Sequence, residues 1–230
     1  MSGNPQSVNL QPGNIWVKIC GNTSLEDAQL AAEARADAVG FVFAPSPRLV
    51  TLTQVAAIVP HLPAAVEKIG VFVDASFSEI ASTVEACSLT GVQLHFNAPP
   101  ELSKQLRQRF GPSLRILGVV HFDADGQNAA SRVIEDPNID GVLVDSRTAT
   151  AAGGTGIAYD WIAASKSLFQ NAEERKLIVA GGLNPANVAE AIAALHPWGV
   201  DVVSGVESAP GKKDPAKVRA FIANARAAAK

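Results

Sequence analysis

Lys18 and Cys20 are the first residues in the sequence whose side chains could do chemistry. They lie at the end of an apolar run, residues 15–19, and directly before Gly21. A free thiol has a pKa of about 8.5, and a nearby cation or helix N-terminus lowers it. Because Lys18 is close and a helix is expected just after the thiol, we expect a lowered pKa for Cys20. The alternative is an inert thiol, since most buried cysteines act as small apolar side chains. For Cys87, which lies within an apolar helical pattern, we expect an inert thiol.

Polar side chains recur in later apolar runs that favour β-strands. Because side chains alternate between the two faces of a strand, Gln93 shares a face with His95, and Asp145 shares one with Leu143. Asp201 lies within the last of these runs. We expect these residues to face the inside of one sheet. The apolar residues between them should face covering helices, as should those beside Lys18: Val17, Ile19, Val92, Leu94, Val142 and Val144.

A lysine on the inner face of a sheet needs a counter-charge. Asp201 lies on the last predicted strand, which is adjacent to the first if the sheet closes on itself. The sequence therefore predicts an ion pair between Lys18 and Asp201. For Gln93, a hydrogen bond within the core is the simpler role.

Glycines follow the last three predicted strands, namely Gly153, Gly154 and Gly156, then Gly181 and Gly182, and finally Gly205 after Ser204. Asn184 is expected to cap a helix that begins at Pro185. Backbone N–H groups at such loops bind phosphate, and α/β barrels often do so after strands seven and eight. The sequence therefore predicts a phosphate site at the loops after these two strands. The loop with Gly153 could form a third wall or a lid.

Alternating strand and helix patterns position these residues. Strands are expected at residues 15–19, 38–43, 68–74, 91–95, 115–120, 140–145, 176–181 and 200–204, and helices at 24–36, 51–59, 78–87, 100–110, 127–135, 159–169, 185–195 and 214–228. The strand runs are almost continuously apolar, which is typical of parallel strands covered on both faces. Eight such units with right-handed crossovers close naturally into a barrel.

We therefore predict an α/β protein with a single domain, a (β/α)8 TIM barrel over residues 15–230. A flexible N-terminal tail, residues 1–14, precedes it. The main alternative is an open doubly wound sheet, but no Gly-x-Gly-x-x-Gly fingerprint follows the first strand.

The composition is that of a globular protein, with 230 residues, 47% hydrophobic residues, 18% charged residues and a net charge of −3. This mild acidity gives no reason to expect a nucleic acid or an anionic membrane as a partner. No apolar run approaches the ~20 residues that a membrane helix needs. Residues 1–14 lack the features of a signal peptide, and two cysteines in unlike surroundings favour a reducing cytoplasm.

The four histidines do not predict a metal site. His61, His95, His121 and His196 lie on separate strand–helix units without the spacing of metal ligands. Of these, only His95 is a candidate for lining a pocket.

Taken together, the chain resembles the phosphoribosylanthranilate isomerases of tryptophan biosynthesis over nearly all of residues 15–228. The stretches that carry the resemblance are 18–21 (KICG), 40–43 (GFVF), 46–48 (SPR), 91–95 (GVQLH), 144–146 (VDS), 153–156 (GGTG) with 160–161 (DW), 180–185 (AGGLNP) with Asn187 and Val188, 200–202 (VDV) and 204–207 (SGVE). The resemblance implies an intramolecular oxidoreductase-type isomerase without metal or organic cofactor. Its reaction would be the Amadori rearrangement of N-(5′-phosphoribosyl)anthranilate to an aminoketose phosphate.

The resemblance also implies residue roles. Cys20 matches the general base that removes the C2′ proton, Asp145 the general acid that protonates the furanose ring oxygen, and Arg48 the arginine that positions the anthranilate carboxylate. A thiolate is a competent base, and a protonated carboxyl group can donate. The remaining expected site residues are His95, Gly156, Gly181, Gly182, Ser204 and Gly205 for substrate binding, with Lys18 and Asp201 as structural support. The only expected partner is the small-molecule substrate, for a monomer or a homodimer.

The sequence departs from the family pattern in three places. Phe96 replaces the glycine that usually follows the histidine, Val203 replaces the serine that usually precedes Ser204, and the loop before Ser46 is shorter. Two other functions fit the sequence less well. A related histidine-pathway isomerase uses two aspartates, so Cys20 argues against it, although the sequence leaves open whether that substrate is accepted as well. The combination of Cys20, Asp145 and Arg48 argues against a barrel that only binds a phosphorylated metabolite.

Overall fold

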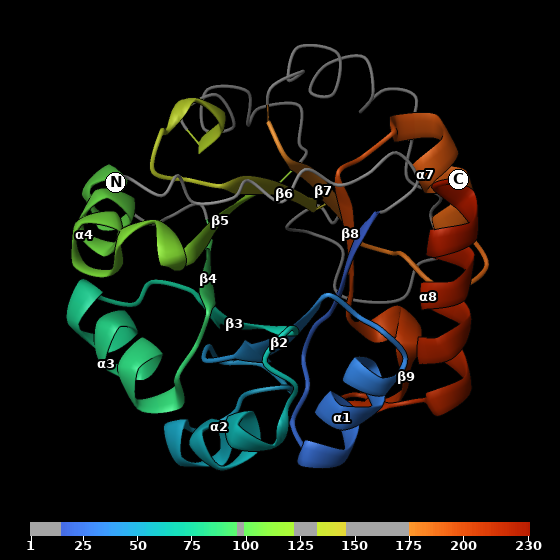
Figure 1. Cartoon of the computed structure of the whole chain (residues 1–230), viewed down its shortest axis with the longest axis horizontal. Helices are drawn as coiled ribbons and strands as arrows, with labels where there is room; N and C mark the ends of the chain where they lie inside the picture. Colours follow the sequence, from blue (N-terminus) through green and yellow to red (C-terminus); the bar gives the residue numbers. More distant parts are fainter. Residues whose placement is uncertain (1–14, 96–98, 122–132, 146–174) are drawn as a thin grey trace, which may run out of the picture.

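Eight parallel strands form a closed barrel in the computed structural model of the protein (Figure 1). The structure describes residues 15–95, 99–121, 133–145 and 175–230. The barrel strands follow one another in sequence order and are β1 (Trp16–Ile19), β2 (Ala38–Val42), β3 (Glu67–Phe72), β4 (Gly91–Leu94), β5 (Arg115–His121), β6 (Gly141–Asp145), β7 (Leu177–Ala180) and β8 (Gly199–Val202). Pairing of β1 with both β2 and β8 closes the barrel. The predicted barrel fold is confirmed, and an open doubly wound sheet is excluded.

Helices surround the strands on the outside (Figure 1). The described α-helices are α1 (Leu25–Glu33), α2 (Leu52–Ile58), α3 (Phe77–Cys87), α4 (Pro100–Phe110), α7 (Val188–Leu195) and α8 (Pro215–Ala228). Four of these helices have an N-cap side chain that accepts hydrogen bonds from backbone N–H groups of the first turn. The caps are Ser24 for α1, Thr51 for α2, Ser76 for α3 and Asp214 for α8. Of the described helices, none is long and apolar enough to span a membrane.

Shorter elements complete the described chain. They are the 3-10 turns η1 (Val59–His61), η2 (Gly111–Ser113) and η4 (Ser204–Val206), and a small antiparallel hairpin of β9 (Glu207–Ala209) and β10 (Lys212–Lys213). The hairpin follows β8 and leads into α8. It becomes important for the site, because two of its charged side chains are buried.

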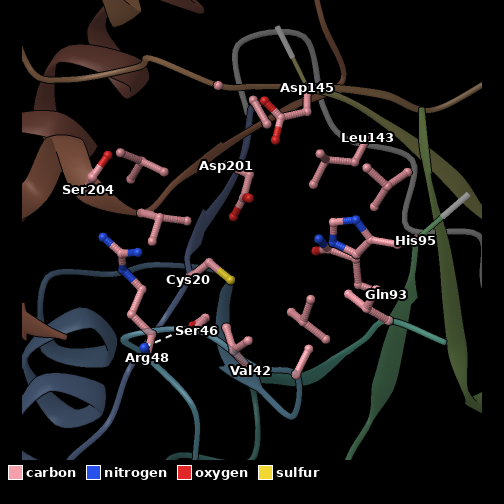
Figure 2. Close-up of a pocket in the computed structure, with 18 of the residues that line it drawn as sticks. Cys20, Val42, Ser46, Arg48, Gln93, His95, Leu143, Asp145, Asp201 and Ser204 are labelled. Atoms are coloured by element: carbon pink, nitrogen blue, oxygen red, sulfur yellow. Dashed lines mark hydrogen bonds between the residues drawn. The ribbon is translucent and has the colours of Figure 1, made fainter. Parts of the chain in front are cut away.

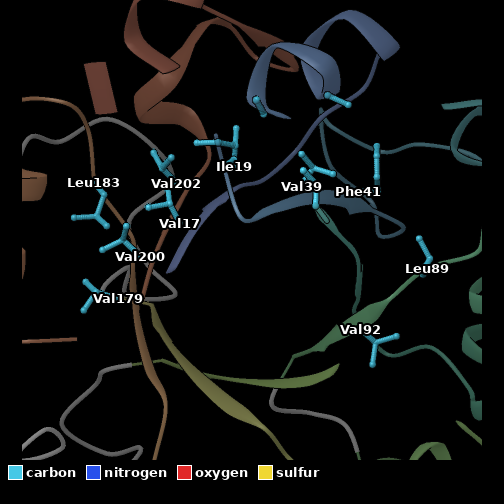
Figure 3. Packing of buried hydrophobic residues seen from close by; sticks show 14 of the residues in the cluster. Val17, Ile19, Val39, Phe41, Leu89, Val92, Val179, Leu183, Val200 and Val202 are labelled. Carbon is cyan, nitrogen blue, oxygen red and sulfur yellow. The ribbon is translucent and has the colours of Figure 1, made fainter. Parts of the chain in front are cut away.

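Two apolar layers hold the barrel together. One lies between strands and helices, where Val17, Ile19, Val92 and Val200 are fully buried (Figure 3). The other fills the inside of the barrel and consists of Trp16, Ala38, Ile69, Leu117, Val119, Leu143, Ile178 and Ala180. The outward orientation predicted from side-chain alternation is confirmed for Val17, Ile19, Val92, Leu94, Val142 and Val144, all of which lie in the outer layer. The barrel thus encloses both this apolar layer and buried polar side chains such as Lys18, Gln93 and Asp201.

The start of α7 was predicted wrongly. The helix begins at Val188, and Asn184 does not cap it. Instead, Asn184 N–H donates to Oδ1 of Asn187 at 2.8 Å, and Asn187 N–H donates to the Asn184 carbonyl at 3.3 Å. These reciprocal bonds hold residues 184–187 in a turn, which delays the helix by one turn.

Several predictions concern residues outside the described ranges. They are the tail at residues 1–14, the helix at 159–169, the loop at 153–156 with Gly156, and Phe96. Most of the predicted helix at 127–135 also lies there, although residues 133–135 are described and helical.

Candidate active site

A pocket of about 240 Å³ opens at the carboxyl ends of the barrel strands (Figure 2). The pocket is lined by most of the predicted site residues that the structure describes, namely Cys20, Arg48, His95, Asp145, Gly181, Gly182, Asp201 and Ser204, together with Gln93. The sulfur of Cys20 and the carboxyl group of Asp145 face the same hollow from different strands. Gly205 directly follows Ser204, and Lys18 lies one layer deeper in the barrel. The chain thus brings a thiol, a carboxyl group and a guanidinium to one cavity.

The backbone around Cys20 is held on both sides. Cys20 N–H donates to the Val202 carbonyl of β8 at 2.9 Å. The side-chain amide of Asn22 donates to the carbonyls of Ile19 at 2.8 Å and of Gly40 at 3.1 Å. Between them, Gly21 adopts a φ of +74°, a conformation that favours glycine. The thiol therefore projects from a fixed turn rather than from a loose loop.

Gly40 on β2 gives the Cys20 sulfur its space. A Cβ added to Gly40 would lie 2.5 Å from Cys20 Sγ, well inside van der Waals contact. We expect Gly40→Ala to displace the sulfur and to lower kcat/KM by up to about 100-fold, since a catalytic group moved by an ångström can cost that much. Overpacking should also cost about 1–3 kcal/mol of stability. Steady-state kinetics and thermal denaturation test both effects.

Gly118→Ala is the matched control. A Cβ on this β5 glycine would lie 2.4 Å from the Val133 side chain, on the helix side of the barrel and away from the pocket. It should lower stability as well, but leave kcat/KM per folded molecule nearly unchanged. Full activity of Gly40→Ala would show that the sulfur does not need this space.

The predicted ion pair between Lys18 and Asp201 is confirmed. The two residues are register partners on β1 and β8, and Lys18 Nζ lies 2.9 Å from Asp201 Oδ1. The same ammonium donates to Gln93 Oε1 at 2.9 Å, so Gln93 makes the expected core hydrogen bond. Burial alone would lower the pKa of Lys18, but the Asp201 carboxylate and Cys20 raise it above its ordinary value. A protonated, fully buried lysine thus lies beneath the Cys20 thiol.

The expected lowering of the Cys20 pKa is wrong. Burial raises the pKa of the thiol, the nearby Lys18 lowers it, and Asp201 raises it again. The net pKa lies above the ordinary value because Cys20 is only 3% exposed and Asp201 offsets the charge of Lys18. The helix that we expected to lower the pKa of Cys20 begins only at Leu25, after the Ser24 cap.

Arg48 is held by a carboxylate that was not predicted as a site residue. Its Nε and Nη2 atoms donate to Glu207 Oε1 at 2.8 Å and Oε2 at 2.6 Å, and its backbone N–H donates to Ser46 Oγ at 2.9 Å (Figure 2 shows the bond to Ser46). Burial alone would raise the pKa of Glu207, but Arg48 and Lys213 together hold it below its ordinary value. The sequence signal for Glu207 was its place as the only acidic residue in the segment directly after β8.

The loops after β7 and β8 touch one another through glycine. Gly181 and Gly182 have φ angles of +81° and +66°. A Cβ on Gly205 would lie 1.9 Å from the Leu183 carbonyl oxygen, so only glycine allows this approach. Gly181, Gly182 and Ser204 line the pocket, so both loops reach its rim. Such a rim can hold a phosphate.

Histidines do not form a metal centre in the described chain. Within the described ranges, no group of three or more His, Cys, Asp or Glu side chains could hold a metal ion. His95 lines the pocket, whereas His61 is in η1 and His196 follows the C-terminus of α7. Cys20 and Asp145, which also line the pocket, carry a thiol and a carboxyl group, side chains of the types that can transfer protons.

Comparison with known proteins gives one consistent result. Residues 17–224 match the sequence model of the family described as N-(5′-phosphoribosyl)anthranilate (PRA) isomerase. The chain is 41% identical over 209 residues to the N-(5′-phosphoribosyl)anthranilate isomerase of Pelobacter propionicus, covering 90% of this chain and 94% of that protein.

Solved structures agree with this match. The crystal structure of phosphoribosyl anthranilate isomerase from Thermotoga maritima has a TM-score of 0.80 and 36% identity, over 93% of this chain and 100% of that one. A phosphoribosyl anthranilate isomerase in complex with reduced 1-(o-carboxyphenylamino)-1-deoxyribulose 5-phosphate has a TM-score of 0.78 and 35% identity, with the same coverage.

Proposed function

The chain belongs to the N-(5′-phosphoribosyl)anthranilate isomerase family, enzymes of tryptophan biosynthesis, and on this premise we propose that Cys20 is its general base and Asp145 its general acid. The observation that carries the proposal is that both side chains line one pocket from different strands. The catalytic domain is proposed to comprise residues 15–230.

The proposed substrate orientation follows from the charges around the pocket. The phosphate binds the rim of Gly181, Gly182, Ser204 and Gly205, with Gly156 as a further contact. The anthranilate carboxylate binds Arg48, whose planar guanidinium matches a carboxylate. The ribose then lies between Cys20 and Asp145, with His95 beside it. Val203, where relatives have serine, lines the same pocket without a hydroxyl, so Ser204 supplies the side-chain hydroxyl at this position.

Catalysis begins with opening of the ring. Asp145 donates a proton to the furanose oxygen, the bond between C1′ and that oxygen breaks, and the anthranilate nitrogen supplies the electron pair that forms an iminium. Cys20, as thiolate, then removes the C2′ proton, and the electrons of that C–H bond neutralise the iminium. The resulting enol tautomerises to the aminoketose, so the reaction is an isomerisation without net gain or loss of atoms.

The raised pKa of Cys20 fits this order of steps. A thiol with a raised pKa is a stronger base once it is ionised, and a nearby positive charge favours the ionised form. The iminium supplies such a charge only after the ring has opened. Lys18 beneath the sulfur provides a permanent one, which lowers the pKa that burial raises.

The ionisation of Cys20 should report its raised pKa. The thiolate and not the thiol is the nucleophile, so the rate at which iodoacetamide alkylates Cys20 should rise with pH as the thiolate forms. Since burial raises the pKa of Cys20, the midpoint of this rise should lie above the ~8.5 of an ordinary thiol. Alkylation rates measured in a Cys87→Ser background between about pH 7 and about pH 10 test it. A plateau reached below the ordinary thiol value would contradict it, and a variant that also carries Cys20→Ser should not be alkylated.

We further propose that the protein works in a reducing cytoplasm, as a monomer or a homodimer. Both Cys20 and Cys87 are free thiols, and the proposed base has to remain one. The proposed acid, base and carboxylate-binding arginine all come from one chain, which is compatible with either assembly.

The proposed function is tested by turnover of chemically generated phosphoribosylanthranilate. Conversion to the aminoketose phosphate should be visible as loss of anthranilate-type fluorescence. The purified protein should accelerate this loss without added metal or cofactor. No acceleration at any protein concentration would overturn the proposal.

A further inference from the structure

Lys213 is a buried lysine that the proposed mechanism does not use. It lies on β10, its side chain has no exposed surface, and it does not line the Cys20 pocket. Its ammonium donates to the carbonyl of Cys20 at 2.6 Å, the carbonyl of Val203 at 3.3 Å and Glu207 Oε1 at 3.3 Å. An ammonium has three N–H donors, so this set of acceptors uses all of them.

The three acceptors belong to different parts of the site. Cys20 follows β1 and carries the proposed base, whereas Val203 follows β8. Glu207 is the carboxylate that holds the Arg48 side chain. One ammonium therefore connects the turn that carries the base to the partner of the arginine.

The Glu207 carboxylate is fixed in orientation by this arrangement. Its Oε1 accepts from Arg48 Nε, from Lys213 Nζ and from the Gly211 backbone N–H, while Oε2 accepts from Arg48 Nη2. A carboxylate with only the arginine as partner could rotate together with it. Because Lys213 and Gly211 also bind Oε1, the plane of the carboxylate is set, and with it the plane of the guanidinium.

Lys213 is itself fixed at its backbone. Its N–H donates to Asp27 Oδ1 at 3.2 Å, and the preceding turn is held by a 2.6 Å bond from Thr23 Oγ1 to the Gly211 carbonyl. The hairpin is thus attached to the start of α1, directly after the Cys20 turn. Burial lowers the pKa of Lys213 below its ordinary value, and the Glu207 carboxylate offsets part of this effect, so the charge of the ammonium depends on this partner.

We propose that Lys213 is a positioning residue that, through Glu207, sets the orientation of the Arg48 guanidinium toward the substrate carboxylate. It holds that orientation relative to the end of β1 that carries Cys20. The proposal rests on the proposed role of Arg48 in binding the anthranilate carboxylate.

A pair of ligands separates this role from general support of the fold. One is reduced 1-(o-carboxyphenylamino)-1-deoxyribulose 5-phosphate, and the other is its phenylamino counterpart without the carboxyl group. The wild-type protein should bind the carboxylated ligand more tightly. Lys213→Met should reduce this preference by about tenfold, the scale of one charge-assisted hydrogen bond, and leave affinity for the carboxyl-free ligand nearly unchanged. Calorimetric titration measures both affinities.

Lys217→Met is the matched control. Lys217 also reaches Glu207, but its Nζ donates to the backbone carbonyl at 2.8 Å and not to the carboxylate. This variant should keep the full preference. Glu207→Gln should reduce the preference as Lys213→Met does, and it tests the proposal on its own if Lys213→Met does not fold.

The outcomes separate the two proposals. The positioning role would be overturned if Lys213→Met weakened the binding of both ligands equally, or if it left the preference for the carboxylated ligand undiminished. The same outcomes count for Glu207→Gln if that variant has to replace Lys213→Met. Arg48→Met should abolish the preference. If it does not, the proposed role of Arg48 is wrong; if it does while Lys213→Met keeps the preference, only the inference about Lys213 is wrong.

Discussion

We expect replacement of Cys20 by serine to lower kcat by about 10²–10⁴-fold, the contribution that a positioned general base makes. A hydroxyl has almost the shape of a thiol but is a far weaker acid, so the alkoxide that would be needed as base does not form. Arg48 and the glycine-rich rim remain in place. The affinity for reduced 1-(o-carboxyphenylamino)-1-deoxyribulose 5-phosphate should therefore change little. Fluorescence assays of turnover and calorimetric titration of the ligand test the two halves of this prediction.

Cys87→Ser is the control for the same exchange elsewhere. The Cys87 thiol is buried at the end of α3 and donates to the Leu52 carbonyl at 3.4 Å, outside the barrel. Serine can make the same hydrogen bond there, so turnover should be retained. Unchanged turnover in Cys20→Ser would remove the thiol from the mechanism but leave the fold intact.

Replacement of Asp145 by asparagine should lower kcat by a similar factor, about 10²–10⁴-fold, because an amide has nearly the same shape but no acidic proton to donate to the ring oxygen. The residue ends β6 and is 5% exposed. Ring opening would then become the slow step, and the closed substrate should accumulate on the protein. Single-turnover kinetics should show binding at the wild-type rate followed by slow conversion.

Asp140→Asn provides the comparison on the same side of the barrel. Asp140 directly precedes β6, at the opposite end of the strand, where its Oδ2 accepts from Arg107 and from the Ile116 backbone N–H. Its replacement should lower stability and spare kcat. Loss of ligand affinity in Asp145→Asn, in proportion to its loss of kcat, would mean that Asp145 binds substrate and does not act as an acid.

Much of the barrel and its inner face follows from local patterns. Near-continuous apolar strands, separated by helix caps such as Ser24, indicate βα units, and a period of two along a strand places side chains on one face or the other. The same alternation, combined with closure between the first and last strands, predicted the pair of Lys18 and Asp201. The register between β1 and β8 makes these two residues direct neighbours.

The features that could not be predicted from the sequence depend on burial and on contacts between residues far apart in the chain. Proximity of Lys18 predicted a lowered pKa for Cys20, but the sequence does not show how completely the sulfur is enclosed or that Asp201 offsets the charge of Lys18. Lys213 is one of two adjacent lysines in a short polar hairpin, a pattern typical of solvent-exposed residues. Its burial becomes evident only when the hairpin folds back on the Cys20 turn.

The closest test of the shared pocket is a crystal structure of the protein with reduced 1-(o-carboxyphenylamino)-1-deoxyribulose 5-phosphate. We expect the Cys20 sulfur about 3.5 Å from C2 of the ribulose moiety, a distance that allows reaction. The Asp145 carboxyl group should lie beside the oxygen that closed the ring, and Arg48 against the benzoate. A ligand whose C2 lies beyond the reach of the sulfur, or whose former ring oxygen faces away from Asp145, would contradict the assignment of base and acid.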